Sequence, residues 1–183
     1  MNLSIVKEKL QDAGVAFDNG LTEAEIQLVE RSFSFSFPPD LKAFVMFALP
    51  RGEKWPNWRN VEAPELELMM NWPCEGICFD IENNAFWPTE WGTKPASLDE
   101  ACELAKRMVD KAPKLIPIYG HRYLPDRPSL EGNPVFSVYQ TDIIYYGANL
   151  WNYFQNEFRY QFGVAGYQVD EPLRRIEFWS DLI

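Results

Sequence analysis

Positive charge and long apolar runs are scarce in this sequence. Its 17 Lys and Arg residues stand against 27 Asp and Glu residues, which gives a net charge of −10. This balance argues against a nucleic-acid partner, because phosphate is bound by Lys and Arg. No apolar run approaches the roughly 18–20 residues that a membrane-spanning helix needs. Lys7, Glu8 and Lys9 place charges where a signal peptide carries its apolar segment, so we expect a cytoplasmic protein with neither nucleic-acid nor membrane partners.

Cysteine and histidine are also rare, with three and one residues. The odd cysteine count suggests no disulfide framework. Cys74, Cys78, Cys102 and His121 are in principle four zinc ligands, but no second close pair completes a finger-like site. We expect buried thiols that behave as small apolar residues. For His121 we expect a structural or surface role, with partner contact or general-base catalysis as the alternatives.

Motifs of catalysis are absent. The chain has no phosphate-binding glycine loop and no Gly-x-Ser-x-Gly nucleophile motif. Asp80 and Glu82 are two residues apart on a predicted strand and thus on one face. Such a pair can divide acid and base roles or bind a divalent cation, but we expect it to form a charged outer face of the strand. We predict no catalytic residue, metal site or cofactor, and keep a small hydrolase as the enzymatic alternative.

Local signals predict five helices in the 183 residues, which we expect to form one domain over residues 1–183. A capping box, in which two side chains satisfy each other's free backbone N–H, opens the second helix at Thr22 and the fourth at Ser97. The other three are expected from Leu3 to Gly14, after Pro39, and from Asn149 to Gly163.

Alternating and β-prone segments predict strands between these helices. They are residues 77–81, 115–119, 135–139, 142–146 and 175–179. Residues 50–73 are expected to be irregular, with a short helix or strand at 66–70. The tight connection near residue 140 requires an antiparallel pair. The expected fold class is therefore α+β, with helices packed against a mainly antiparallel sheet.

Several of these segments together resemble the SUKH superfamily. The residues that carry the resemblance are Gly20-Leu-Thr-Glu-Ala-Glu-Ile26, Phe37-Pro-Pro-Asp-Leu-Lys-Ala-Phe44, Phe86-Trp87 with Trp91-Gly92, Leu115-Ile-Pro-Ile-Tyr119, and Asn133 to Gly147 followed by Leu150 to Tyr153. Their order and spacing cover roughly residues 20–160. The chain departs from the family at Ala48-Leu-Pro-Arg-Gly52, where many members carry a Gly-Gly pair. The resemblance implies a binding fold without catalytic residues, used by bacterial immunity proteins against toxins and by fungal cell-wall-synthesis regulators.

Acidic residues gather in one part of the chain. Between Asn60 and Ala105 ten Asp and Glu residues face one cation, Lys94, so this segment carries −9 of the net −10. An acidic surface attracts a basic partner and speeds the encounter, whereas a merely solvated face would have no such role. Tryptophans lie within or beside this segment, in irregular and polar stretches. If their rings are exposed, they are suited to a protein interface; the alternative is that they are buried and close the edge of an aromatic core.

These observations predict a protein-binding domain, most simply an immunity protein that blocks a basic toxin domain. The predicted partner-binding residues are Trp55, Trp58, Glu62, Trp87, Glu90 and Trp91. The alternative is a regulatory or scaffold module that binds an endogenous protein.

Overall fold

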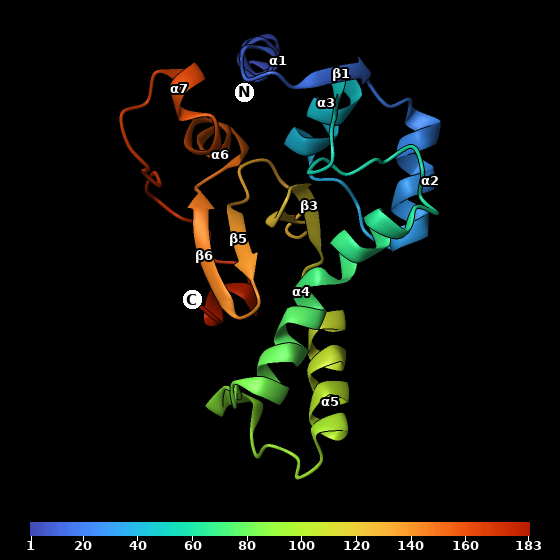
Figure 1. The fold of residues 1–183 in the computed structure, drawn as a ribbon, viewed down its shortest axis with the longest axis vertical. Helices are drawn as coiled ribbons and strands as arrows, with labels where there is room; N and C mark the ends of the chain where they lie inside the picture. Colours follow the sequence, from blue (N-terminus) through green and yellow to red (C-terminus); the bar gives the residue numbers. More distant parts are fainter.

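The computed structural model describes all of residues 1–183 as seven α-helices, six strands and two short 3-10 helices (Figure 1). The α-helices are α1 (Leu3–Asp12), α2 (Glu23–Phe33), α3 (Pro39–Phe47), α4 (Pro64–Asn83), α5 (Leu98–Lys111), α6 (Leu150–Glu157) and α7 (Arg159–Phe162). The strands are β1 (Ala16–Asn19), β2 (Ala48–Arg51), β3 (Leu115–Tyr119), β4 (Arg122–Pro125), β5 (Val135–Tyr139) and β6 (Asp142–Gly147). The 3-10 helices are η1 (Thr89–Trp91) and η2 (Trp179–Asp181). None of the helices combines the length and the apolar character that a membrane crossing requires.

The strands form two antiparallel sheets. β3, β4, β5 and β6 follow one another in a four-stranded meander, and β1 pairs with β2 separately. The predicted hairpin near residue 140 is β5–β6, in which Ser137 lies opposite Ile144. The predicted α+β class, with helices on an antiparallel sheet, is confirmed.

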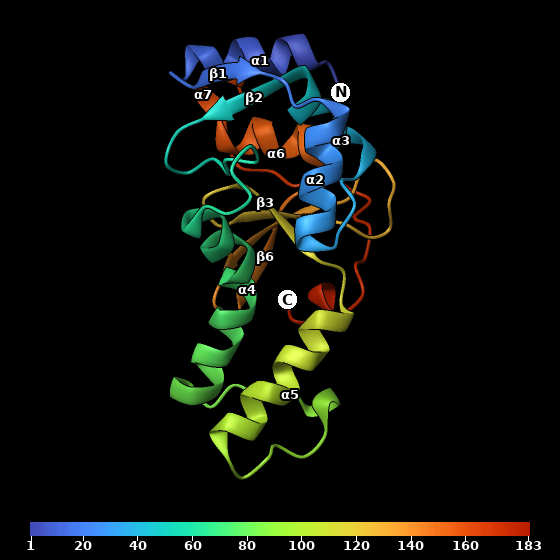
Figure 2. The same ribbon diagram turned by 90° about the vertical axis from the view of Figure 1, so that its right-hand side faces the viewer.

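The four-stranded sheet has helices on both sides (Figure 2), and it separates two groups of buried side chains. One group joins the sheet to α1, α2, α3 and α6, and includes Ile116, Leu124 and Val135 from the strands. The other joins the opposite side to α4, α5 and the C-terminal segment, and includes Tyr123 and Phe136. Successive strand residues point to opposite faces, which is why neighbours such as Val135 and Phe136 belong to different groups.

The α4–α5 pair projects from the rest of the molecule as a helical hairpin, which we call the arm (residues 64–111; Figures 1 and 2). Its root packs against the sheet, and the connection that contains η1 lies toward its far end. At Gly76, α4 approaches the β5–β6 turn so closely that an added Cβ would lie 2.7 Å from Gln140 Cα. Only glycine fits that contact, so this residue sets the spacing between arm and sheet.

Residues 77–81 belong to α4, so the prediction of a strand there was wrong, as was that of irregular structure through residue 73. Ile77 and Ile81 are four residues apart and fit a helical face as well as a strand pattern, an ambiguity inherent in short apolar runs. From sequence alone, Pro73 also favours the end of a helix, because proline has no N–H to donate to the carbonyl four residues earlier. Here that carbonyl, Met69 O, accepts a hydrogen bond from the Tyr123 hydroxyl at 2.8 Å, and the helix continues through Pro73.

The predicted strand at 175–179 is also wrong, because this segment pairs with no sheet. The Ile176 N–H donates to the Ser180 hydroxyl at 2.8 Å, so the chain closes on itself and enters η2. Trp179 is buried and its indole N–H donates to Pro113 O at 2.6 Å. These contacts hold the C-terminal segment against the end of α5.

The local helix signals are confirmed. Thr22 and Glu25 form the reciprocal capping box of α2, and Asn149 caps α6. Ser97 caps α5 by accepting from the Glu100 N–H, but the return bond of the predicted capping box is not formed. Gly163 ends α7 in the left-handed conformation, at φ 68°. The predicted last helix is divided at Phe158 into α6 and α7.

Candidate protein-binding surface

The carboxylates of the acidic segment cover the arm and its root. Nine of the ten acids between Asn60 and Ala105 are exposed, Asp80 being the exception. Among these nine, only Glu103 forms an ion pair, with Lys106 at 3.1 Å. The segment's one cation, Lys94, donates to Ile81 O at 3.0 Å and so faces the carbonyl end of α4. This acidic segment therefore presents eight exposed carboxylates that no ion pair neutralises, seven of them on the arm and Glu62 just before it.

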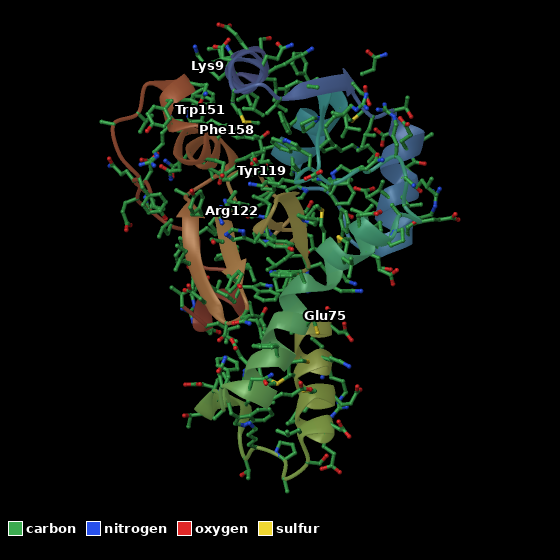
Figure 3. All side chains as sticks on the ribbon, viewed as in Figure 1. Lys9, Glu75, Tyr119, Arg122, Trp151 and Phe158 are labelled. Atoms are coloured by element: carbon green, nitrogen blue, oxygen red, sulfur yellow. The ribbon has the colours of Figure 1, made fainter.

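One face of α4 also exposes large apolar side chains. Leu68, Trp72 and Phe79 are 62%, 42% and 47% exposed, and their spacing of four and seven residues places them on one stripe of the helix. The unpaired carboxylates of Glu75 and Glu82 follow one edge of that stripe; Figure 3 labels Glu75 on the arm. Contiguous exposed apolar residues rimmed by charge are typical of protein-interaction sites.

Near the root of the arm this stripe meets the sheet and forms what we call the aromatic patch, made of Leu68, Trp72, His121 and Tyr139. The Trp72 indole N–H donates to Val138 O at 3.1 Å, which fixes the ring. The Tyr139 ring lies 6.2 Å from Trp72 and 6.3 Å from His121, centroid to centroid. The patch borders a hollow of about 310 Å³ that is mainly apolar. A hollow of this size can accept an anchoring side chain of a partner.

His121 contributes no positive charge to the patch at pH 7. Burial lowers the pKa of His121, and the positive charges of Arg122 and Lys54 lower it further. Its imidazole is therefore neutral at pH 7. Arg122 itself is engaged with Glu157 at 3.0 Å, beside the sheet (Figure 3).

The sequence predicted that Trp55 and Trp58 lie in a stretch too polar to bury both rings, and this was wrong. They are 6% and 2% exposed. Trp58 makes edge contacts with three phenylalanines from the end of α2 and the segment after it. Trp55 packs against Tyr119 and Phe158, both labelled in the upper part of the molecule in Figure 3. The folded protein therefore presents neither ring to a partner.

The other four predicted residues remain accessible in part. Glu62 is exposed just before the arm. Trp87, Glu90 and Trp91 lie together at η1, where the two half-buried indoles are 5.3 Å apart and Glu90 is exposed. Trp91 stacks on Phe178 at 5.9 Å, beside a groove of about 640 Å³ that Glu90 also lines. This cluster lies on the arm, so the structure groups it with the acidic surface.

Asp80 and Glu82 do not form a carboxylate pair. Because they lie on a helix and not on a strand, their side chains point in different directions, and only Asp80 is buried. Asp80 accepts hydrogen bonds from the backbone and hydroxyl of Thr141 and from Asn84. Burial opposes ionisation, but these hydrogen bonds lower the pKa of Asp80 below its ordinary value. The carboxylate thus links α4 to the β5–β6 turn. No group of three or more His, Cys, Asp or Glu side chains is arranged to hold a metal ion.

Sequence reasoning missed Leu68, Trp72, Phe79 and Tyr139. The first three recur at helical spacing within the stretch 66–81, a signal that is informative only once that stretch is read as one helix. Comparison with protein-family models, with curated proteins and with solved structures found no match. The SUKH resemblance therefore stays a prediction.

Proposed function

We propose that this chain is a non-catalytic protein-binding domain that neutralises a basic protein by covering it, as a bacterial immunity protein covers a toxin domain. The observation that carries the proposal is the arrangement on α4. Its exposed apolar stripe of Leu68, Trp72 and Phe79 lies beside carboxylates that have no cation of their own. Binding through this surface needs no reacting group.

Each part of the surface has a distinct physical role in the proposal. The aromatic patch supplies affinity, because rigid Trp and Tyr rings bury large areas at little entropic cost. The arm carboxylates supply encounter rate and select a basic partner, since charge complementarity acts chiefly on association. The cluster of Trp87, Glu90 and Trp91 extends the contact toward the end of the arm.

The partner class rests on the charge and on the SUKH resemblance. A toxin domain that acts on nucleic acid is basic, because it must bind phosphate, and it matches an acidic arm. The three cysteines are free, which suits the reducing cytoplasm where we propose that the protein acts. The alternative partner, an endogenous protein bound for regulation, fits the same surface and is separated by identifying what binds.

Two patch variants and one matched control test the affinity component. A partner captured from lysate of the source cell with immobilised protein is identified by mass spectrometry, purified and titrated. We expect Trp72→Ala and Tyr139→Ala each to weaken binding by about 2 kcal/mol, roughly thirtyfold in Kd. Tyr160→Ala is the control, because Tyr160 is 93% exposed on α7, away from the arm. Equal Kd values for all three variants would place the binding surface elsewhere.

Charge reversal tests the electrostatic component. Glu65, Glu75 and Glu82 on α4 are changed together to lysine, and a control triple changes Glu8, Glu53 and Glu171, which are exposed and lie off the arm. Both triples alter the net charge equally. We expect the arm triple alone to lower the association rate strongly at low salt, with the difference shrinking as salt screens it. Identical association rates for the two triples would refute steering by the arm.

A further inference from the structure

The three cysteines lie together where α4 packs against α5. Cys74 and Cys78 are one helical turn apart on α4, and Cys102 faces them from α5. Cys78 Sγ lies 3.9 Å from Cys102 O, and Cys102 Sγ lies 3.8 Å from Cys78 O. The contact is reciprocal, so both thiols cross the same interface and meet there.

Small residues allow this close approach. Ala101 and Ala105 flank Cys102 on the buried face of α5 and are fully buried against the side of α4 that carries Ile77 and Ile81. A disulfide requires Cα atoms within about 7 Å and Cβ atoms directed at each other. Each thiol lies within 4 Å of the other residue's carbonyl oxygen, between helices that approach through alanines, which favours the close approach that a disulfide needs.

We propose that Cys78 and Cys102 form an oxidation site, at which a low-molecular-weight disulfide such as glutathione disulfide converts the two thiols into a covalent link between α4 and α5. Cys102 Sγ lies 3.5 Å from Glu82 Oε1 of the proposed binding surface, but the oxidation of the two thiols is argued from their own contact and does not depend on the proposed function.

The reaction balances as two thiol–disulfide exchanges. Cys78 is half-buried and Cys102 is only 6% exposed, so the Cys78 thiolate attacks glutathione disulfide first and releases one glutathione thiolate. The Cys102 thiolate then attacks the Cys78 sulfur of the mixed disulfide and releases the second. Two protein thiols are oxidised, one glutathione disulfide is reduced, and the two protons move to the glutathione thiolates.

The surroundings of the pair decide how it reacts. A groove of about 390 Å³ opens between α4 and α5 and is lined by Cys74, Glu75, Lys106 and Asp110. Burial raises the pKa of Cys78, and the positive charge of Lys106 opposes that rise. Burial also raises the pKa of Cys102, to about 12. Little thiolate exists at neutral pH, so the exchange is slow there.

The link would close the outer half of the arm into a ring. The chain between Cys78 and Cys102 contains η1, with the Trp87, Glu90 and Trp91 cluster. Oxidation would therefore restrain the end of the arm while leaving the aromatic patch, which lies before Cys78 on α4, outside the ring.

Incubation of the reduced full-length protein with glutathione disulfide at pH 8 tests the proposal. Free thiols are then alkylated, and the intact mass and the non-reduced peptides are measured. We expect the loss of two hydrogen atoms and a peptide pair joined through Cys78 and Cys102, with Cys74 outside the bond. The Cys74→Ser variant should form the same link, and Cys102→Ala should stop at a glutathione adduct on Cys78.

Three outcomes would overturn the proposal. They are a bond that includes Cys74, a wild-type protein that stays at the mixed disulfide, and a wild-type protein that does not react while its unfolded form does. Peptide mapping of the folded wild type distinguishes the first two outcomes, and the same mapping of the unfolded wild type identifies the third, so the test survives if a cysteine variant folds poorly. Circular dichroism of Cys102→Ala shows whether its result can be used.

Discussion

Replacing Asp80 with alanine removes the acceptor that joins α4 to the β5–β6 turn. The carboxylate accepts from the Thr141 N–H at 2.9 Å and from the Thr141 hydroxyl and the Asn84 amide. Hydrogen bonds to an ionised group contribute about 1.5–3 kcal/mol each. Asn84 is exposed, so its bond is taken at a few tenths of a kcal/mol. The two Thr141 bonds, each taken at the lower end of that range, then give an expected loss of about 3–4 kcal/mol, part of it from the orphaned Thr141 N–H.

Urea unfolding at pH 7 measures this loss. For an unfolding slope of about 2 kcal/mol per molar urea, the midpoint should fall by roughly 1.5–2 M. Asp80→Asn should cost less than Asp80→Ala, because its amide oxygen still accepts from Thr141. Glu75→Ala is the control, since it removes an exposed carboxylate from the same helix and should change the midpoint little. A loss below about 1 kcal/mol for Asp80→Ala would refute the assignment.

The pH dependence gives a second, independent check. The folded pKa of Asp80 lies below its ordinary value, and the unfolded chain has a pKa of about 3.9. A carboxylate of this kind stabilises the fold fully above the unfolded pKa, and the contribution is lost as pH falls through the folded pKa. The difference in unfolding free energy between wild type and Asp80→Asn should therefore shrink from pH 7 toward pH 2. A difference that stays constant over that range would contradict the argument.

Three further outcomes are expected. Tyr123→Phe leaves the carbonyl freed by the proline of α4 without a donor and should cost about 1–3 kcal/mol in urea unfolding; no change would mean that water replaces the hydroxyl. Gly76→Ala forces a Cβ to within 2.7 Å of Gln140 Cα and should destabilise by about 1–3 kcal/mol, whereas a neutral result would show that the turn shifts freely. Cross-linking of Cys78 to Cys102 should accelerate roughly tenfold per pH unit between pH 7 and 8, because thiolate is limiting below the raised thiol pKa values; a flat rate would mean that thiol ionisation does not limit the reaction.

The sequence predicted what local chemistry decides. The capping box at Thr22, the cap at Asn149 and the β5–β6 hairpin depend on residues within a few positions of each other, and all are confirmed. The fold class followed from these elements. The four-stranded sheet adds β4, which local signals did not reveal because Pro125 and the short loop at Gly120 mask it.

Features that depend on distant residues were missed. Helix α4 passes through Pro73 because Tyr123, 54 residues away from Met69, completes its hydrogen bonding. Trp58 is buried because phenylalanines near the end of α2 surround it. The residues next to Trp58 in the sequence give no signal that predicts this packing. The acidic surface was predicted from the composition of one segment. The aromatic patch could not be predicted in this way, because it forms only where α4 packs beside Tyr139 of β5.

The three hydrogen bonds that fasten α4 to the sheet have a consequence for recognition. Trp72 donates to Val138 O, Tyr123 donates to Met69 O, and Thr141 donates to Asp80. These bonds fix the helix at three points along its length, so its orientation is set before a partner binds. A preorganised surface loses little conformational freedom when it docks. If α4 binds as proposed, losing the Tyr123 or Asp80 hydrogen bond should therefore weaken the complex by raising the entropic cost of docking, although neither residue belongs to the proposed contact.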